Sequence, residues 1–324
     1  MKKTLLMLAL CAACLNAGAE PVQYWLNGVS TEGGWKDVNK VMDKSIDGDS
    51  ALCWAAAASN IIAWWQEQNA SELVGRGNDI PQGEQNIFNA FNDGFYNKGF
   101  DSYWGLRWFM DGGPELYEPI IESYSPADIY MDPASSNHGG YYNDIVVDVA
   151  SSMESYSQFE TDDSGFLVMD VIPLEVFTQE LVSCMSRGYG VTLGLEASYG
   201  GHAITLWGME MDEDGYIAKM WVTDSDDAPN PKVDVDGLIP LELTRVRKEK
   251  STVNSGLQEY YVYEIRDLLG EGGGVWYHGN DEYIDSFAAL NPKVAFMPRS
   301  VPEPCTGTLS LLALAGLCAR RRRK

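Results

Sequence analysis

The sequence has 324 residues, of which 47 are acidic and 23 are basic, and its formal net charge at pH 7 is -24. Nucleic acid and anionic lipid repel a chain this acidic, so we expect no nucleic-acid partner and no binding to a charged membrane surface. The length suffices for a large core in one domain or in two close-packed lobes.

Residues 1–19 have the features of a secretory signal peptide. Two lysines precede a short apolar run, and Ala17-Gly18-Ala19 forms a small-residue cleavage site. The apolar run is too short for a stable membrane-spanning anchor. Lipid attachment at Cys14 is disfavoured, because the residue three positions before it is unsuitable for that processing. We therefore expect an exported protein.

Residues 50–68 predict the best-defined helix of the chain. Four consecutive alanines give high helix propensity, and apolar side chains recur at spacings of three and four residues. Ser50, or Asp49 before it, is a suitable N-cap. With Ser50 as the cap, Cys53 would be the third helical residue, where unpaired N–H groups and the helix dipole stabilise a thiolate. The alternative is that Cys53 is a small core residue.

The remaining predicted elements run from helices to strands. A stretch rich in Gly, Asn and Pro at 75–86 ends the first helix, 87–125 predicts short helices, and 128–165 predicts loops. An amphipathic helix is expected over 173–187, closed by Gly188. Extended patterns follow at 191–195, 202–210, 216–223, 238–246 and 259–265. This order predicts an α+β fold rather than alternating βαβ units.

Residues 202–223 predict a β-hairpin with a three-residue turn. The turn at 213–215 would place its glycine in the left-handed conformation and pair residues whose numbers sum to 428. In this register His202 lies opposite Asp226 and diagonal to Asp224, so that all three share one face of the hairpin. A two-residue turn would put them on opposite faces.

Residues 301–324 form a C-terminal segment in three parts. Pro302-Glu303-Pro304 precedes an apolar run, and the chain ends in four arginines and a lysine. The run is shorter than a membrane-spanning helix. The pattern resembles the Pro-Glu-Pro C-terminal sorting signals of Gram-negative bacteria, which a membrane protease removes. This resemblance implies delivery to the cell surface or extracellular matrix, and a weak tail anchor is the alternative.

Four of the six cysteines lie in the two end segments, which leaves Cys53 and Cys184 in the body of the chain. A single disulfide between them is one alternative in an exported protein, and a free thiol kept for reactivity or burial is the other. We expect Cys184 in the core, because it lies on the amphipathic helix. No motif for a transition-metal site is present, and Asp224-Ser225-Asp226 lacks the calcium-loop pattern, so no metal is expected.

A cysteine with a distant histidine and carboxylate is the residue set of a thiol hydrolase. His202 would accept the proton of Cys53 or pair with it as an imidazolium, and Asp224 or Asp226 would fix its tautomer. The alternative for His202 is a hydrogen-bonded core histidine. The other two histidines are expected on the surface: His138 and His278.

Three stretches carry a family resemblance: Gly34 to Lys40, Leu52 to Trp65, and the hairpin strands His202 to Gly208 and Tyr216 to Asp226. They resemble the Mac/IdeS group of streptococcal immunoglobulin-cleaving cysteine proteases. This resemblance implies a papain-like fold, in which a central helix bearing the nucleophile packs against an antiparallel sheet that carries the histidine hairpin.

By the same resemblance, Cys53 is the nucleophile, His202 the base and Asp224 its orienting partner. Asp226 is a supporting acid. Lys40 matches the lysine that helps to form the family's oxyanion hole, where a cation stabilises the developing negative oxygen. The resemblance implies no cofactor. The sequence departs from the family pattern at two points. A tryptophan follows the nucleophile where the family pattern has glycine, and the interval between Lys40 and Cys53 is longer than in the family.

These features predict a papain-like catalytic domain over residues 20–300, exported by a Gram-negative bacterium. The expected function is a cysteine endopeptidase that acts on an extracellular protein, with no assumption that this protein is an immunoglobulin. The expected processing partner is the membrane protease that removes the sorting signal. Two alternatives are a peptidoglycan amidase or transamidase on the same scaffold, and a non-catalytic surface or matrix protein.

Overall fold

The computed structural model describes residues 21–77, 79–112, 135–161, 168–197, 200–226, 237–266 and 283–298. The predicted signal peptide and sorting segment lie outside these residues. Among the residues described, no helix is both long enough and apolar enough to cross a membrane.

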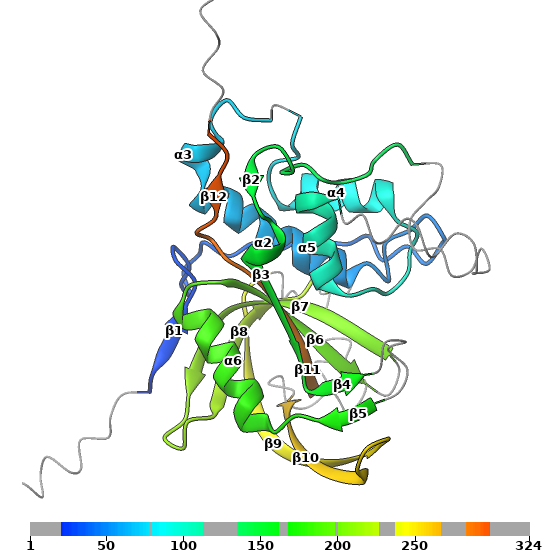
Figure 1. Ribbon diagram of the computed structural model, residues 1–324, viewed down its shortest axis with the longest axis vertical. Coiled ribbons are helices and arrows are strands. Elements are labelled where there is room, and N and C mark those ends of the chain that lie inside the picture. The colour runs from blue at the N-terminus through cyan, green and yellow to red at the C-terminus, as the bar shows by residue number, and fades with distance from the viewer. Residues whose placement is uncertain are drawn as a thin grey trace, which may run out of the picture.

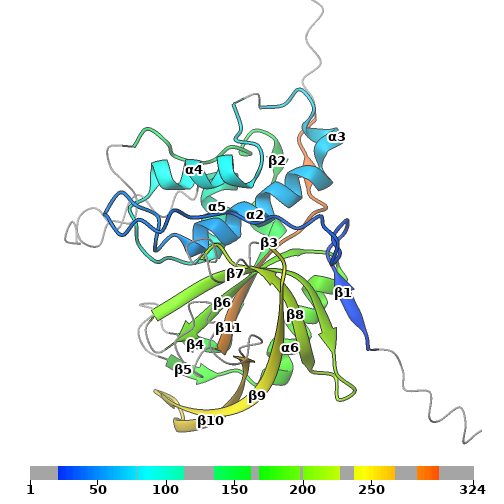
Figure 2. The same cartoon turned by 180° about the vertical axis from the view of Figure 1, so that it is seen from behind.

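The chain forms a helical layer stacked on a curled sheet, as Figures 1 and 2 show. This mixed architecture, with helices mostly before strands, agrees with the α+β prediction. The helices are α2 (Cys53–Gln68), α3 (Ala70–Leu73), α4 (Glu84–Gly94), α5 (Ser102–Asp111), the 3-10 helix η3 (Ala150–Ser152) and α6 (Leu174–Ser186). The strands are β1 (Gln23–Trp25), β2 (Val146–Val147), β3 (Met153–Ser157), β4 (Phe159–Thr161), β5 (Val168–Val171), β6 (Gly190–Ala197), β7 (Gly200–Met211), β8 (Ile217–Thr223), β9 (Ile239–Thr252), β10 (Gly256–Arg266), β11 (Tyr283–Leu290) and β12 (Ala295–Phe296).

The main sheet is antiparallel throughout, and six of its strands close into a ring. The order β7-β6-β11-β10-β9-β8 returns to β7, because β7 pairs with β6 along its first half and with β8 along its second half. β1 adds to the far end of β7, and β3 adds to β11. Ring closure leaves few free strand edges and fixes where each strand of the ring ends.

Helix α2 lies where the helical layer meets the sheet, against α4 and α5 on one side and β6 and β7 on the other (Figure 2). Its side chains are apolar on nearly every face, and almost all of them are buried, as expected for a helix at the centre of a core. Glycine at position 190 allows β6 to approach the helix, because a Cβ there would lie 2.9 Å from Ile61 and Trp64. The middle of α2 therefore packs closely against the sheet.

The predicted amphipathic helix is confirmed as α6. Its apolar face packs on the sheet and includes Phe177, Leu181 and Cys184, all buried. Gly188, with φ of 76°, follows its last turn, as the sequence predicts.

Strands β7 and β8 form the predicted hairpin. Gly215 has φ of 84°, which confirms the left-handed position in the turn. Met211 pairs with Ile217 and Thr205 with Thr223, as the predicted register requires. Between these points two irregularities shift the pairing by one residue and then restore it, so the predicted register is wrong in the middle of the hairpin. The two shifts cancel before the strands reach the histidine.

Residues 128–165, predicted as loops, are only partly irregular where they are described. The strand β3 lies in this stretch and pairs with β11 over five residues. The sequence patterns also missed β1 and β11 themselves. β3 and β11 line the cleft described below, so these omissions bear on the site.

Candidate active site

Cys53 is the first residue of α2, and only 8% of it is exposed. The prediction that the helix starts at Ser50 is wrong: Leu52 is the N-cap, without a side-chain cap. Residues 49–52 form a turn instead, in which the Leu52 N–H donates to the Asp49 carbonyl at 3.0 Å. The thiol still lies in the first helical turn, where the helix dipole favours a thiolate.

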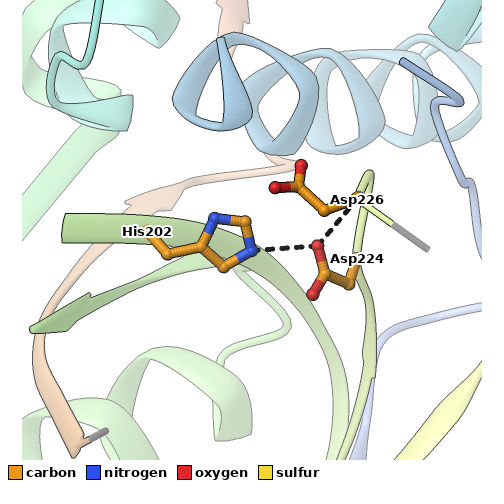
Figure 3. Close-up of side chains that lie close together, drawn as sticks. All are labelled: His202, Asp224 and Asp226. Atoms are coloured by element: carbon orange, nitrogen blue, oxygen red, sulfur yellow. Dashed lines mark hydrogen bonds and ion pairs between the residues drawn. The ribbon is translucent and has the colours of Figure 1, made fainter. Parts of the chain in front are cut away.

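His202 on β7 and Asp224 at the end of β8 meet above the sheet (Figure 3). The ring Nε2 lies 2.9 Å from Asp224 Oδ1, and Asp224 is buried with only 2% exposed. The Asp226 N–H donates to the same carboxylate oxygen at 3.0 Å, which fixes its orientation. With Nε2 bonded to Asp224, the Nδ1 atom is left for another partner.

The Cys53 thiol is close enough to the His202 side chain for each group to shift the pKa of the other, through its charge and through hydrogen bonding. The structure therefore brings together a thiol, an imidazole and a carboxylate from residues 53, 202 and 224. Their order, with the imidazole between the other two, is the arrangement by which a base activates a nucleophile and is itself oriented by an acid.

The pKa values of the thiol and the imidazole shift toward an ion pair. Burial raises the pKa of Cys53, but the charge and hydrogen bond of His202, helped by the charge of Lys40, lower it overall. Burial lowers the pKa of His202, but the charges of Asp224 and the Cys53 thiolate raise it well above the usual value. Both shifts therefore favour the thiolate and imidazolium pair over the neutral thiol and imidazole.

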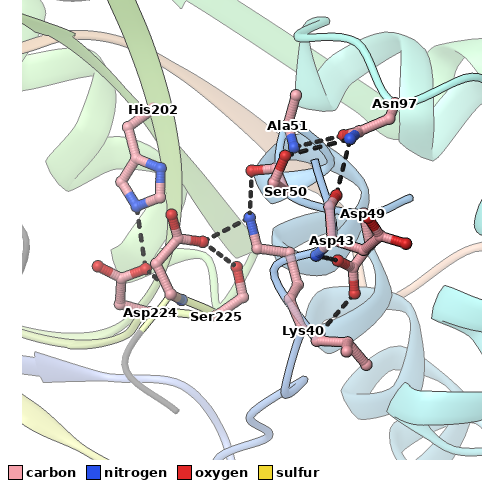
Figure 4. A network of polar contacts seen from close by, with 11 residues as sticks. Lys40, Asp43, Asp49, Ser50, Ala51, Asn97, His202, Asp224 and Ser225 are labelled. Atoms are coloured by element: carbon pink, nitrogen blue, oxygen red, sulfur yellow. Dashed lines mark hydrogen bonds and ion pairs between the residues drawn. The ribbon is translucent and has the colours of Figure 1, made fainter. Parts of the chain in front are cut away.

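Lys40 lies on the other side of the carboxylates (Figure 4). Its side chain is fully buried, and its Nζ is 2.5 Å from Asp226 Oδ1. The same ammonium donates to the Ser50 carbonyl at 3.0 Å, just before the helix that carries the thiol. Lys40 therefore joins the loop before α2 to the end of β8 and places a positive charge close to Cys53.

Asp49 and Asn97 organise the loop between Lys40 and α2. The Asp49 carboxylate accepts hydrogen bonds from the N–H groups of Val41 and Asp43, at 2.6 and 2.9 Å. Asn97 accepts one from the Ala51 N–H at 2.6 Å. The sequence reasoning missed Asn97, because nothing in its local pattern ties it to a loop more than 40 residues earlier. For Asp49, the sequence predicts only a possible role as a helix cap.

Three of these residues have donor atoms close enough to hold a metal ion: His202, Asp224 and Asp226, within 4.8 Å of one another. Each carboxylate already has a cationic or N–H donor, namely the His202 ring for Asp224 and the Lys40 ammonium for Asp226. A metal ion would have to displace these partners. The donor set is therefore better suited to orienting the imidazole than to holding an ion.

The other candidate residues lie away from this cluster. Cys184 is a free thiol, as is Cys53, so the alternative of a disulfide between them is wrong. Burial, a hydrogen bond to Glu154 and the Glu154 charge raise the pKa of Cys184 to about 12 despite the nearby Arg187, so it is a poor nucleophile. His138 is exposed, as predicted, whereas His278 lies outside the described residues.

Cys53 and His202 line a cleft of about 550 Å³ between the two layers. The start of α5 forms one wall, and strands β3, β6, β7 and β11 form the floor and the opposite wall. A polypeptide segment in this cleft would pass over the thiol and the imidazole.

Two comparisons relate the chain to known proteins. The family model described as Mac 1 matches residues 19–103 and 173–264. These ranges include the five residues with proposed roles in the site: Lys40, Cys53, His202, Asp224 and Asp226. The IgM protease of Streptococcus suis (strain P1/7) is 29% identical over an alignment of 289 residues, which covers 79% of this chain. The matched region is 22% of that relative, so the chain spans about a fifth of its length.

Proposed function

The chain belongs to the Mac 1 family, and on this premise we propose that it is an exported cysteine endopeptidase that hydrolyses peptide bonds of an extracellular protein. The similarity to an IgM protease supports protease activity of the cysteine type. The observation that carries the proposal is the contact series from Cys53 through His202 to Asp224 inside a cleft.

In the proposed acylation step, the Cys53 thiolate attacks the carbonyl carbon of the scissile peptide bond. A C–S bond forms, and the carbonyl oxygen becomes an oxyanion. When the oxyanion collapses, the C–N bond breaks and the His202 imidazolium gives its proton to the leaving amine. The products of this step are an acyl-enzyme, a free amine and a neutral imidazole.

Water completes the cycle. The neutral His202 accepts a proton from a water molecule, whose oxygen attacks the thioester carbonyl, and the C–S bond breaks to release a carboxylic acid and the thiolate. Asp224 holds the ring with Nε2 toward itself and stabilises the imidazolium, so that Nδ1 is used in both proton transfers. The thiolate and imidazolium pair is thereby restored.

We further propose that Lys40 stabilises the oxyanion. Its buried ammonium lies beside the residues that precede Cys53, and its charge acts on the thiol. A fixed positive charge in a site with little water lowers the energy of a developing negative oxygen. Asp226 supports this role because it pairs with the ammonium and keeps it at this position.

The proposal includes the fold family and the domains. We propose a papain-like catalytic domain over residues 20–300, on the grounds that the nucleophile starts a central helix and the base lies on the adjoining antiparallel sheet. Residues 1–19 would be a signal peptide, and 301–324 a sorting signal removed by a membrane protease. The protein would then act at the surface or in the extracellular matrix of a Gram-negative bacterium.

The relative's name gives an immunoglobulin as its substrate, whereas our proposal for this chain requires only an exposed peptide segment that enters the cleft. The direct test is to incubate the chain with a panel of extracellular proteins and to identify the new N-termini by mass spectrometry. Wild type and Cys184→Ala should cleave, and Cys53→Ala should not. Release of cell-wall stem peptides without protein cleavage would favour an amidase instead.

A further inference from the structure

The cleft that contains Cys53 and His202 extends along β11, where Asp285 and Ser286 line it. Asp285 lies at an irregularity of this strand. Ile284 pairs with Leu195 and Ser286 with Gly194, so Asp285 is an extra residue without a partner on β6. A bulge of this kind turns a side chain away from its regular alternation, and bulges are frequent beside active sites. The strand therefore departs from regular pairing at the residue that puts a carboxylate in the cleft.

Gly194, across from this bulge, leaves the space that the two side chains use. A Cβ at position 194 would lie 2.1 Å from Ser286 Oγ and 3.3 Å from Asp285 Oδ1. A larger residue would displace the Ser286 hydroxyl and make a tight contact with the Asp285 carboxylate. The glycine and the bulge together set the position of the carboxylate in the cleft.

The Asp285 carboxylate has no cationic partner in the part of the chain that the structure describes. Ser286 Oγ donates to its Oδ1 at 2.9 Å. Lys250, whose charge acts on Asp285, is instead paired with Glu196 at 3.4 Å and lies over the Phe159 ring at 3.7 Å. The carboxylate is thus half-buried next to the active site without an ion-pair partner among the described residues, and a cationic ligand would supply one.

Charged groups near Asp285 add to the local excess of negative charge. Burial raises the pKa of Asp285 to about 6; the Ser286 hydroxyl and Lys250 lower it, and the negative charges of Glu196 on β6 and Asp101 on α5 raise it. Asp101 also lines the cleft, at the start of α5. The electrostatic potential at this part of the cleft is therefore negative, which favours a cation.

We propose that Asp285 forms a specificity subsite that binds a lysine or arginine side chain of the substrate, an inference that rests on the endopeptidase function proposed above. The cationic end would pair with Asp285 in place of solvent. The aliphatic stem would pack on the aromatic rings that line the same cleft: Phe100, Tyr156 and Phe287. The substrate class is then a protein segment with a basic residue close to the scissile bond.

The first experiment identifies the position of the basic residue. A peptide library made by digesting a proteome is incubated with wild type and with Cys53→Ala, and the cleaved bonds are identified by mass spectrometry. We expect lysine and arginine to be enriched at one fixed position within about three residues of the bonds that only wild type cleaves.

The second experiment uses one such peptide, synthesised with arginine or with citrulline at that position. Citrulline has nearly the shape of arginine but no charge. In wild type, kcat/KM should be about tenfold or more higher for the arginine peptide. In Asp285→Asn the ratio should fall close to one, while in Asp285→Glu it should stay above one. Glu213→Gln removes a charge at the distant hairpin turn and should leave the wild-type ratio unchanged.

A third measurement needs no variant and so does not depend on whether Asp285→Asn folds. In wild type, the ratio of kcat/KM for the arginine peptide to kcat/KM for the citrulline peptide should fall as pH decreases through about 6, because Asp285 becomes neutral there. Ionisation of Cys53 and His202 affects both peptides alike and cancels in the ratio.

The outcomes separate the two proposals. Absence of any bond cleaved by wild type but not by Cys53→Ala would overturn the endopeptidase itself. Cleavage without an enriched basic position, or an arginine preference that persists in Asp285→Asn, would overturn the subsite and leave the endopeptidase standing.

Discussion

At the scale of single residues, the site depends on how a few charges are placed around one buried thiol. Cys53, His202 and Asp224 form one series of contacts, and Lys40 is held by Asp226 beside it. Each of these side chains is mostly buried, so each charge acts through a medium in which electrostatic interactions are stronger than in water. Removal of one member should therefore have an effect on the others.

Removal of the orienting carboxylate is the first prediction. In Asp224→Ala the imidazole loses the acceptor of its Nε2 proton and the charge that favours the imidazolium, so kcat/KM should fall by about 100-fold or more. Steady-state kinetics on a peptide that wild type cleaves would measure this. Cys184→Ala is the control, and an Asp224→Ala enzyme with more than a tenth of wild-type activity would argue against the role.

The second prediction concerns pH. The lowered pKa of Cys53 means that the thiolate forms at a lower pH than an ordinary thiol does, and the raised pKa of His202 means that the imidazolium persists to a higher pH than usual. Activity should rise with the first ionisation and fall with the second, which gives a broad maximum around neutral pH. The profile of kcat/KM against pH would show it.

The interaction between His202 and Cys53 also predicts how the thiol titrates when the imidazole is removed. In His202→Ala, burial of Cys53 is no longer opposed by the imidazolium, so its pKa should rise above the usual thiol value. Thiolate absorbance near 240 nm should then appear only at alkaline pH. A titration identical to that of wild type would show that His202 does not set the thiol pKa.

At the scale of elements, the loop from Lys40 to α2 connects the helical layer to the hairpin. The Lys40 and Asp226 pair closes this connection, and the ammonium is fully buried. Loss of one partner leaves a buried charge without compensation, which typically costs about 3–5 kcal/mol, whereas loss of both is much less costly. This sets up a double-mutant cycle.

The third prediction is the result of that cycle. Asp226→Asn should lower the free energy of unfolding by about 3 kcal/mol, and Lys40→Met with Asp226→Asn should lower it by less than the sum of the single changes. Urea unfolding followed by tryptophan fluorescence would measure all four proteins. Strictly additive changes would mean that the ion pair does not hold the loop.

The elements also show what local sequence patterns could predict. The α6 helix and the turn at Gly215 follow from local periodicity and turn chemistry, and both are confirmed. The register near Thr205 is right only because two irregularities cancel. The start of α2 was misplaced, because a carboxylate from Asp49 and an amide from Asn97 fold the preceding residues into a turn. The Asn97 contact joins residues 46 apart in the chain and leaves no local signal.

The strands that line the cleft could not be predicted from local sequence patterns either. β3 and β11 pair across more than 120 residues, and the sequence around them did not predict either strand. Asp285 lines the cleft because it lies at a bulge of β11. A bulge depends on how two strands pair and not on the residue itself. The reactive residues could be named from their types and spacing, whereas the residues that shape the cleft needed the structure.

At the scale of the whole molecule, the site exists because two layers meet. Helix α2, which starts at Cys53, belongs to one layer, and the β7–β8 hairpin belongs to the other (Figures 1 and 2). His202 on this hairpin comes about 150 residues after Cys53 in the chain. One continuous core of buried side chains extends through both layers and holds them together. The chemistry of Cys53 is therefore a property of the assembled fold.

The most direct test of this account is the rate at which iodoacetamide alkylates Cys53 as a function of pH, followed by mass spectrometry in the folded chain. We predict rapid alkylation of Cys53 well below the pKa of a free thiol (about 8.5), no alkylation of Cys184, and loss of the low-pH reaction in His202→Ala. If Cys53 reacts at neutral pH no faster than an ordinary thiol, or equally fast without the imidazole, the account is contradicted.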